Sequence, residues 1–428
     1  MATFINDAQQ RMRLSLRCLS VSLIGIATGI TIAPTPTFAQ QYEAHAPTTA
    51  AQVLPANRIQ GDHFKVRDPV LAYDFLYHFT IDSDFGAFEV TGDGALRKLV
   101  REIAAIAALK KVDTAEAVGA SAKKAATAPF LFAGSLITNP VDTVSGLPKG
   151  VSYIFGNVVE GATMEHDPSE DSRIKQALLV SSWKRDFAAQ NGVDVYSSNA
   201  VLQKELNRVG WAAAITGLSI SAATAAGGTA ASVLSNMRLA DSVGKVLKEE
   251  PPSRLRIINS EKLKKMGVSE SLAERYLEHL AFTPRHDTVI VESLAQMATA
   301  RGRPAFVQHI LAAKDEVSAN FFQQMAETML GYHNKVSPLD EIVITNGMVI
   351  AQAKNGSTLV PFPLDRGVWT ARAQGILENI QADRQAAGFK GNIDVWVTGT
   401  FSTLARQQLV SRGFTVTENV DDRIGFLY

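Results

Sequence analysis

Histidine, carboxylate and arginine side chains gather in one late part of the chain, and hydrolases use these residue types to activate water and to stabilise charge. The candidates for a polar cluster are His279, Arg285, His286, Asp287, His309 and His333. No histidine has the His-x-x-x-His or His-x-His spacing of a helical or strand metal site, so we expect no metal ion. The six residues could form a composite site only if folding brings them together, and scattered core and surface histidines are the competing interpretation.

Three short patterns follow the order found in serine acyl-enzymes of the penicillin-binding type: Ser121-x-x-Lys124, Ser197-x-Asn199 and Lys354-x-Gly356. That chemistry needs the serine at a helix start facing a sheet whose edge strand carries the Lys-x-Gly pair. Here Ser121 lies in an Ala-rich, helix-prone segment, and Asn355-Gly356 predicts a hairpin turn. Ser197 and Asn199 are residue types that cap helices. We therefore expect no acyl-enzyme site.

Glycine-rich loops give no stronger signal. The chain contains no Gly-x-Ser-x-Gly elbow, no Walker loop and no dinucleotide glycine loop, so no cofactor is predicted. Thr398-Gly399-Thr400 lies between a predicted strand and a predicted helix, where backbone amides could hold an anion. A plain turn with Ser402 as the helix cap is the favoured interpretation.

An aromatic stripe follows the period of a strand. Tyr73, Phe75, Tyr77 and Phe79 alternate with polar residues in a strand predicted from Leu71 to Ile81. A second strand, 85–91, and a helix with apolar residues from Leu96 to Leu109 follow it. Because that helix has an apolar face that could cover the stripe, a core-facing role is favoured over a ligand platform.

The first forty residues predict a secretory signal peptide. Arg11, Arg13 and Arg17 precede an uncharged run, 18–32, and Thr37 and Ala39 are small residues at the two positions that a signal peptidase reads. We expect cleavage before Gln40 and export to the periplasm or beyond. The only cysteine, Cys18, lies within this signal, so the mature chain has no disulfide-linked partner.

Composition limits the class of protein. The 428 residues include 42 basic and 42 acidic side chains, and this balance argues against nucleic-acid binding. A hydrophobic content of 46% is typical of a globular chain with a sizeable core.

The mature chain is predicted to be an α+β protein. We expect a flexible leader at 40–60, a β-hairpin and helical domain at 61–335 and a small α/β domain at 336–428. Pro251-Pro252 marks a break within the helical domain. Asn346-Gly347 and Asn355-Gly356 predict a three-stranded meander, which β-α-β elements follow. The α/β domain could close a core by itself.

An uncharged segment from Val209 to Met237 needs a partner surface. It has the length of a membrane span but few large apolar side chains, so a packed helical hairpin is favoured over membrane contact. Small residues permit close helix packing and a turn. The residues predicted to make helix or membrane contacts are Trp211, Ala213, Gly217, Ser221, Gly227 and Gly228.

Two functions remain open from the sequence. The first is an exported cell-envelope protein without catalytic activity, which binds an envelope protein or a membrane surface. The second is a hydrolase with a composite site in the 279–333 helical block. A deep pocket lined by two or more residues of the predicted polar cluster would favour the hydrolase.

Overall fold

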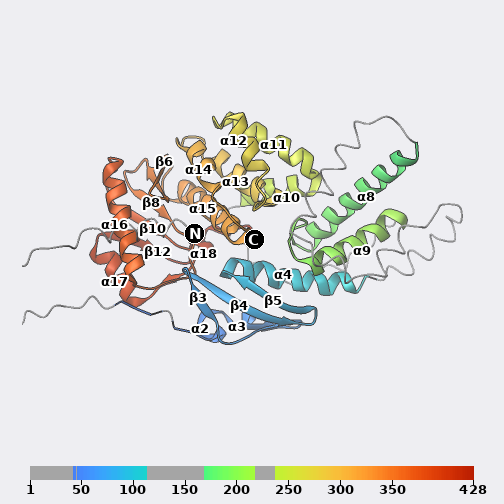
Figure 1. Cartoon of the computed structure of the whole chain (residues 1–428), viewed down its shortest axis with the longest axis horizontal. Coiled ribbons are helices and arrows are strands. Elements are labelled where there is room, and N and C mark those ends of the chain that lie inside the picture. Colours follow the sequence, from blue (N-terminus) through green and yellow to red (C-terminus); the bar gives the residue numbers. More distant parts are fainter. Residues whose placement is uncertain (1–41, 45, 113–167, 217–236) are drawn as a thin grey trace, which may run out of the picture. The chain divides into compact units, whose positions relative to one another are not determined.

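The computed structural model describes residues 42–44, 46–112, 168–216 and 237–428. The described residues from Tyr42 onward belong to one compact unit. Figure 1 shows an antiparallel sheet near the N-terminus, a helical middle and a mixed sheet with helices near the C-terminus. The predicted α+β class is confirmed.

The N-terminal sheet is built around its longest strand, β4. Its strands are β1 (Gln60–Gly61), β2 (Phe64–Val66), β3 (Leu71–Tyr73), β4 (Leu76–Ser83) and β5 (Gly86–Thr91). The prediction of one strand from Leu71 to Ile81 is wrong, because Asp74 and Phe75 have φ angles of 49° and 70° and turn β3 into β4. This tight turn carries the Phe75 ring away from the sheet and into the core of the C-terminal region, where it contacts Phe362.

The turn also divides the aromatic stripe. Tyr73 is 55% exposed, Phe75 is buried in the C-terminal core, and Phe79 is buried beneath the N-terminal sheet. The helix predicted to cover this sheet is confirmed as α4 (Asp93–Lys110). Its Leu96 and Ile103 share a core with Phe79, so only part of the stripe faces this helix.

The C-terminal part of the predicted leader has regular structure. The helices α2 (Ala50–Val53) and α3 (Ala56–Ile59) lie there, and Thr48 forms a bridge with Val70. The Glu43 carboxylate accepts hydrogen bonds from the Trp369 amide at 2.6 Å and the Ser402 hydroxyl at 2.5 Å. Polar groups far along the chain thus form hydrogen bonds with Glu43, and the flexibility of 40–60 stays a prediction.

Eight described helices make up the middle of the chain. They are α8 (Pro168–Gln190), α9 (Ala200–Thr216), α10 (Met237–Glu249), α11 (Pro252–Lys265), α12 (Glu270–Leu277), α13 (Pro284–Gln296), α14 (Arg303–Ile310) and α15 (Glu316–Lys335). The predicted cap of α9 is confirmed, since the Asn199 side chain accepts from the amides of Val201 and Leu202. The break at Pro251 interrupts the helix without separating the packing, because α10 contacts both α8 and α13.

The C-terminal sheet has the strand order β12-β10-β8-β7-β6. Its strands are β6 (Leu339–Thr345), β7 (Met348–Ala353), β8 (Thr358–Pro361), β10 (Ile393–Trp396) and β12 (Phe414–Thr417). The predicted meander is confirmed, and β8, β10 and β12 run parallel through the crossover helices α16 (Ala371–Ala386) and α17 (Thr403–Ser411). Two short strands, β9 (Arg366–Gly367) and β11 (Thr400–Phe401), pair nearby, and α18 (Val420–Ile424) follows β12.

The two faces of this sheet belong to different cores. Val349 and Trp396 pack with the helical block and Tyr332 of α15, whereas Ile350 and Val395 pack with Trp369 on the side of α16 and α17. The alternation follows the period of two along each strand. No break in packing therefore lies at residue 335, and the folding of 336–428 by itself stays a prediction.

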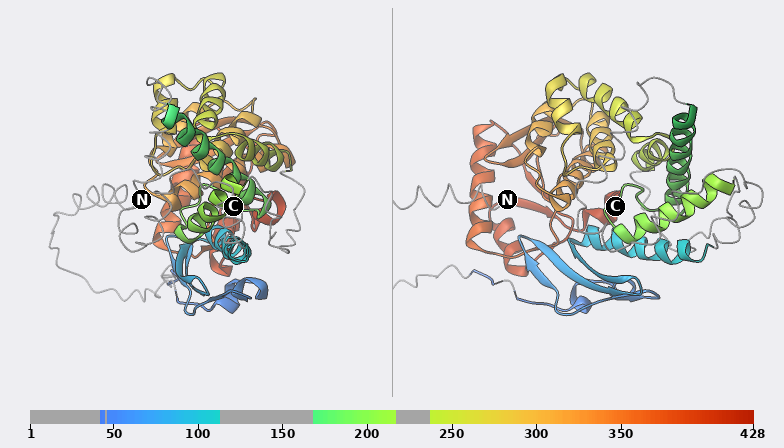
Figure 2. Two further views of the ribbon diagram at one scale, coloured as in Figure 1. Left: turned by 90° about the vertical axis from the view of Figure 1, so that its right-hand side faces the viewer. Right: turned by 45° about the vertical axis from the view of Figure 1, so that its right-hand side comes forward.

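Helix α4 is buried on two sides. Its Ile106 and Leu109 share a core with Phe187 of α8 and Leu206 of α9, while its other face covers the N-terminal sheet. Figures 1 and 2 both show α4 between that sheet and α9. The helix thereby connects the first sheet to the helical middle.

Candidate functional site

A cavity of about 1110 Å³ lies where the N-terminal segment, the start of α4, α15 and the loops of the C-terminal sheet meet. We call it the polar cleft. Its charged lining residues are Glu43, Arg58, Asp93, Arg97, Asp365, Arg366, Asp421 and Asp422. No spacing in the sequence could have predicted this set, because its members come from five separate segments.

Most of these charges are already paired. Asp93, at the start of α4, forms ion pairs with Arg58 and, at 2.8 Å, with Arg97. Arg97 also contacts Asp421 at 2.9 Å. Burial alone would lower the pKa of Arg97, but the Asp93 and Asp421 carboxylates outweigh it and raise the pKa above the ordinary value. The paired Arg97 guanidinium therefore stays charged and is a fixed part of the cleft lining.

Asp365 connects the two sheets at the bottom of the cleft. Its carboxylate accepts from the Tyr77 amide at 2.8 Å and from the Asp93 amide at 3.1 Å. Burial raises the pKa of Asp365 to about 7, and the neighbouring Asp93 charge adds to the rise, while the two amides oppose it. Asp365 thus holds the start of β4 and the start of α4 against the loop after β8.

The turn at Thr398-Gly399-Thr400 is not an anion cradle. The Thr400 amide donates to the Asp365 carbonyl at 3.1 Å, and the Phe401 amide donates to Glu418 at 2.6 Å. A Cβ atom at Gly399 would lie 2.1 Å from the Asp365 carbonyl oxygen, so the loops touch there. Ser402 accepts from the Ala405 amide, which confirms the plain turn with a serine cap.

The described lining of the cleft holds no hydroxyl or thiol paired with a histidine. None of the described lining residues is a histidine or cysteine, and the only serine among them is Ser402. The Ser402 hydroxyl donates to Glu43 at 2.5 Å while it caps α17. A hydroxyl held in this way closes a helix end and is not aimed at a substrate.

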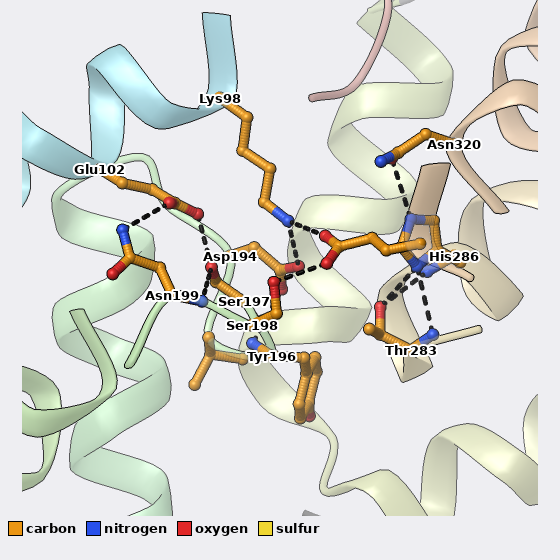
Figure 3. Close-up of polar contacts among 12 residues, drawn as sticks. Lys98, Glu102, Asp194, Tyr196, Ser197, Ser198, Asn199, Thr283, His286 and Asn320 are labelled. Carbon is orange, nitrogen blue, oxygen red and sulfur yellow. Dashed lines mark hydrogen bonds and ion pairs between the residues drawn. The ribbon is translucent and has the colours of Figure 1, made fainter. Parts of the chain in front are cut away.

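A second polar feature lies beside the cleft, and we call it the Lys98 cluster. It consists of Lys98, Glu102, Asp194, Ser197, Ser198, Asn199 and Glu316, most of which are labelled in Figure 3. The Lys98 amine donates to Glu316 at 2.8 Å and lies 4.0 Å from Asp194. The cluster joins α4, the loop before α9 and the start of α15.

Hydroxyl and amide groups satisfy the carboxylates of the Lys98 cluster. Ser197 donates to Glu102 at 2.6 Å, Asn199 donates to its other oxygen at 3.0 Å, and Ser198 donates to Glu316 at 2.5 Å. Burial raises the pKa of Glu102, whereas Lys98 and these donors oppose the rise. Ser197, singled out in the acyl-enzyme pattern, is therefore a hydrogen-bond donor to a buried carboxylate.

His286 lies between the two features. Its Nδ1 accepts from the Thr283 amide at 3.2 Å, so its Nε2 carries the proton and donates to Asn320 at 3.0 Å. Asn320 lines the polar cleft. Burial lowers the pKa of His286, which keeps the ring neutral at pH 7. Figure 3 shows the ring bonded between Thr283 and Asn320.

The other members of the predicted polar cluster do not converge. The His279 ring bonds the Leu311 carbonyl at 3.2 Å, His309 packs on Phe322, and the His333 ring accepts from the Leu339 amide. Asp287 is buried against Tyr276, and burial raises its pKa to about 8. Arg285 forms no ion pair or hydrogen bond with another described residue, and none of the six lines the polar cleft.

The remaining predicted sites fall partly outside the described residues. Ala213 is buried between α9 and α4, whereas Trp211 is 40% exposed. The predicted positions outside the description are Thr37, Ala39, Gln40, Ser121, Gly217, Ser221, Gly227 and Gly228. Lys354 and Gly356 lie at the hairpin turn between β7 and β8, as predicted.

Two physical features bear on metals and membranes. Within the described ranges 42–44, 46–112, 168–216 and 237–428, no group of three acidic, histidine or cysteine ligands could hold a metal ion. The helices in the same ranges include none that is long and apolar enough to cross a bilayer.

Comparison with protein-family models, with curated proteins and with solved structures gave no match for this chain.

Proposed function

We propose that this chain is an exported cell-envelope protein that binds a small polar molecule in the polar cleft and does not transform it. The observation that carries the proposal is the cleft itself, an open volume of about 1110 Å³ whose walls present fixed charges and amides. Ligand sites are concave and have a few well-placed polar groups. The signal-like residues 1–39 support the exported location.

The lining chemistry favours a ligand with hydroxyl or amine groups. Five carboxylates and three arginines line the cleft, so it carries an excess of acceptor oxygens. The side chains of Asp422 and Asn57 are exposed there and form no hydrogen bond with another described residue. Tyr77 and Phe321 add flat apolar surface, which together with acceptors suits a polyhydroxyl compound or an amine.

A ligand screen tests the binding function. We expect millimolar sugars, polyols or amines to raise the melting temperature of the mature protein, since a ligand that binds only the folded state stabilises it. Asp422→Asn should weaken the effect, and Asp241→Asn, at an exposed site on α10, is the matched control. Equal shifts in both variants would exclude Asp422 and this part of the cleft from binding.

Membrane-surface contact is a second proposed function. Leu178 and Leu179 of α8 are 48% and 51% exposed, and Trp211 of α9 is 40% exposed. Gly210 packs on Val180, so these apolar side chains come from neighbouring turns of the two helices. Exposed aromatic and aliphatic groups of this kind favour the interfacial region of a bilayer.

A further inference from the structure

A second cavity, of about 420 Å³, lies at the end of the C-terminal sheet opposite the polar cleft. Ile393, the first residue of β10, lines this cavity, whereas Thr398, which follows the end of β10, lines the polar cleft. We call the second cavity the arginine pocket. Its polar side chains are those of Gln381, Arg384, Gln385, Asn392 and Arg412.

The two arginines of this pocket come from neighbouring elements and have no acidic partner. The Gln381 side chain on α16 donates to the Arg412 carbonyl at 3.2 Å, which holds the residue after α17 against α16. Arg384 lies one turn beyond Gln381 on the same face of α16. Both arginines are partly buried, and neither forms an ion pair with a described residue. None of the described lining residues is acidic.

Other contacts fix the two guanidinium groups without using all their donors. The Nε of Arg384 donates to the Thr358 hydroxyl at 3.3 Å. The Arg412 guanidinium carbon lies 4.8 Å from the ring centroid of the buried Trp369, and its Nη1 donates to the Gln408 carbonyl at 3.0 Å. The Nη1 of Arg384 and the Nη2 of Arg412 form no hydrogen bond with a described residue, so donors remain for a ligand.

Helix ends provide the simplest alternative role for these arginines. Arg384 lies in the last turn of α16 and Arg412 directly follows α17, where cations are favoured. Each helix end carries about half a unit of negative charge, so two ends offset only about half of the two positive charges. The Arg384 carbonyl also accepts from the Phe389 amide at 3.0 Å. The helix ends therefore leave a net positive charge at the pocket.

We propose that the arginine pocket binds a phosphate group. A carboxylate presents two oxygens in one plane and suits one guanidinium, whereas a phosphate presents acceptor oxygens in several directions to two of them. The side-chain amides of Gln385 and Asn392 form no hydrogen bond with another described residue and add donors. The pocket shares no lining residue with the polar cleft, so this site goes beyond the proposed function and does not depend on it.

Inorganic phosphate is the first probe. We expect phosphate, titrated against sodium chloride at constant ionic strength, to bind the mature protein in calorimetry and to raise its melting temperature. Arg384→Gln and Arg412→Gln should each weaken binding about tenfold, the effect of removing a charge-assisted hydrogen-bonding group. Arg254→Gln, at an exposed position on α11, should leave binding unchanged. Acetate that binds as tightly as phosphate would overturn the assignment to phosphate.

A charge placed in the pocket tests the site without removing an arginine contact. Gln385→Glu, at an exposed position in the last turn of α16, should repel the anion and weaken phosphate binding about fivefold. Gln190→Glu, at the exposed last residue of α8, adds the same charge at another helix end and should leave binding unchanged. This pair still carries the test if Arg412→Gln fails to fold. Absence of phosphate binding, or equal binding by Gln385→Glu and Gln190→Glu, would overturn the proposal.

Vesicles distinguish the two sources of a phosphate group, a soluble molecule and a lipid headgroup. Flotation with phosphatidylcholine vesicles that contain phosphatidic acid, reduced in Gln385→Glu but not in Gln190→Glu, would assign the site to a lipid headgroup. Equal flotation of both variants, together with weaker binding of inorganic phosphate by Gln385→Glu, would assign it to a soluble phosphate.

Discussion

The polar cleft and the Lys98 cluster draw on the same helices, α4 and α15, yet they use charge differently. In the cleft, Asp93, Arg97 and Asp421 pair along the wall of an open volume. In the Lys98 cluster, loop hydroxyls close around Glu102 and Glu316. The comparison teaches that charged residues alone do not mark a binding site. What distinguishes the cleft is the space that its charges leave open.

Removal of the Lys98 amine should have the largest effect. In Lys98→Met, Glu316 and Asp194 lose their cation in a partly buried site, and we expect a loss of about 3 kcal/mol in the free energy of unfolding. Urea denaturation would measure it. Lys245→Met, at an exposed position on α10, is the control. Equal losses of unfolding free energy in the two variants would show that the Lys98 cluster does not stabilise the fold.

Asp365, which lines the polar cleft, should make the stability of the protein depend on pH. Its pKa is raised to about 7 in the folded protein, so the fold binds this proton between about pH 4 and pH 7 while the unfolded chain releases it. Stability from this group is therefore lost as the pH rises through that range. We expect the difference between the unmodified protein and Asp365→Asn to fall by about 1 to 3 kcal/mol from pH 4 to pH 7.

Thermal and urea unfolding of the two proteins across that pH range provide the measurement. The histidines whose pKa burial lowers, such as His286, contribute equally to both proteins and cancel in the difference. A difference that does not change with pH would show that the Tyr77 and Asp93 amides keep Asp365 ionised throughout.

Asn199 tests the loop that closes the Lys98 cluster. Asn199→Ala removes the cap of α9 and a donor to Glu102, and a lost cap costs about 1 to 2 kcal/mol. Asn191→Ala, at the other end of the same loop, is a comparison because its side chain donates to the Phe187 carbonyl of α8. A smaller loss of unfolding free energy in Asn199→Ala than in Asn191→Ala would argue that Asn199 does not act both as the cap of α9 and as a donor to Glu102.

Trp211 should give the smallest change in stability. Its side chain is 40% exposed, so Trp211→Ser should shift the free energy of unfolding by about 1 kcal/mol or less. If α8 and α9 contact a membrane surface, flotation with liposomes should decrease in this variant. Val410→Ser, at an exposed apolar position on α17, controls for loss of surface hydrophobicity.

Local signals predicted much of the secondary structure. Asn346-Gly347 supplies positive φ angles at the first turn of the meander, and Asn199 is a strong cap type, so both features were readable. Asp74-Phe75 has no comparable signal. A phenylalanine at φ 70° is set by the tertiary pocket that receives its ring, and the sequence does not display that pocket.

The candidate site was not predictable for a related reason. Asp365 bonds Tyr77 across 288 residues, and Asn320 is important because it joins His286 to the cleft. Such pairs have no fixed spacing and depend on how the two sheets meet. Of the predicted polar cluster, only His286 comes within one hydrogen bond of a cleft residue.

The bonds from Glu43 to Trp369 and Ser402 set an order of folding events. They join groups separated by 326 and 359 residues, and the Phe75 ring likewise needs Phe362. During synthesis Glu43 and the first sheet emerge long before these donor groups and Phe362, so these long-range contacts must wait. In an exported chain, this delay would leave Glu43 and the Phe75 ring without their partners until the C-terminal region has followed them.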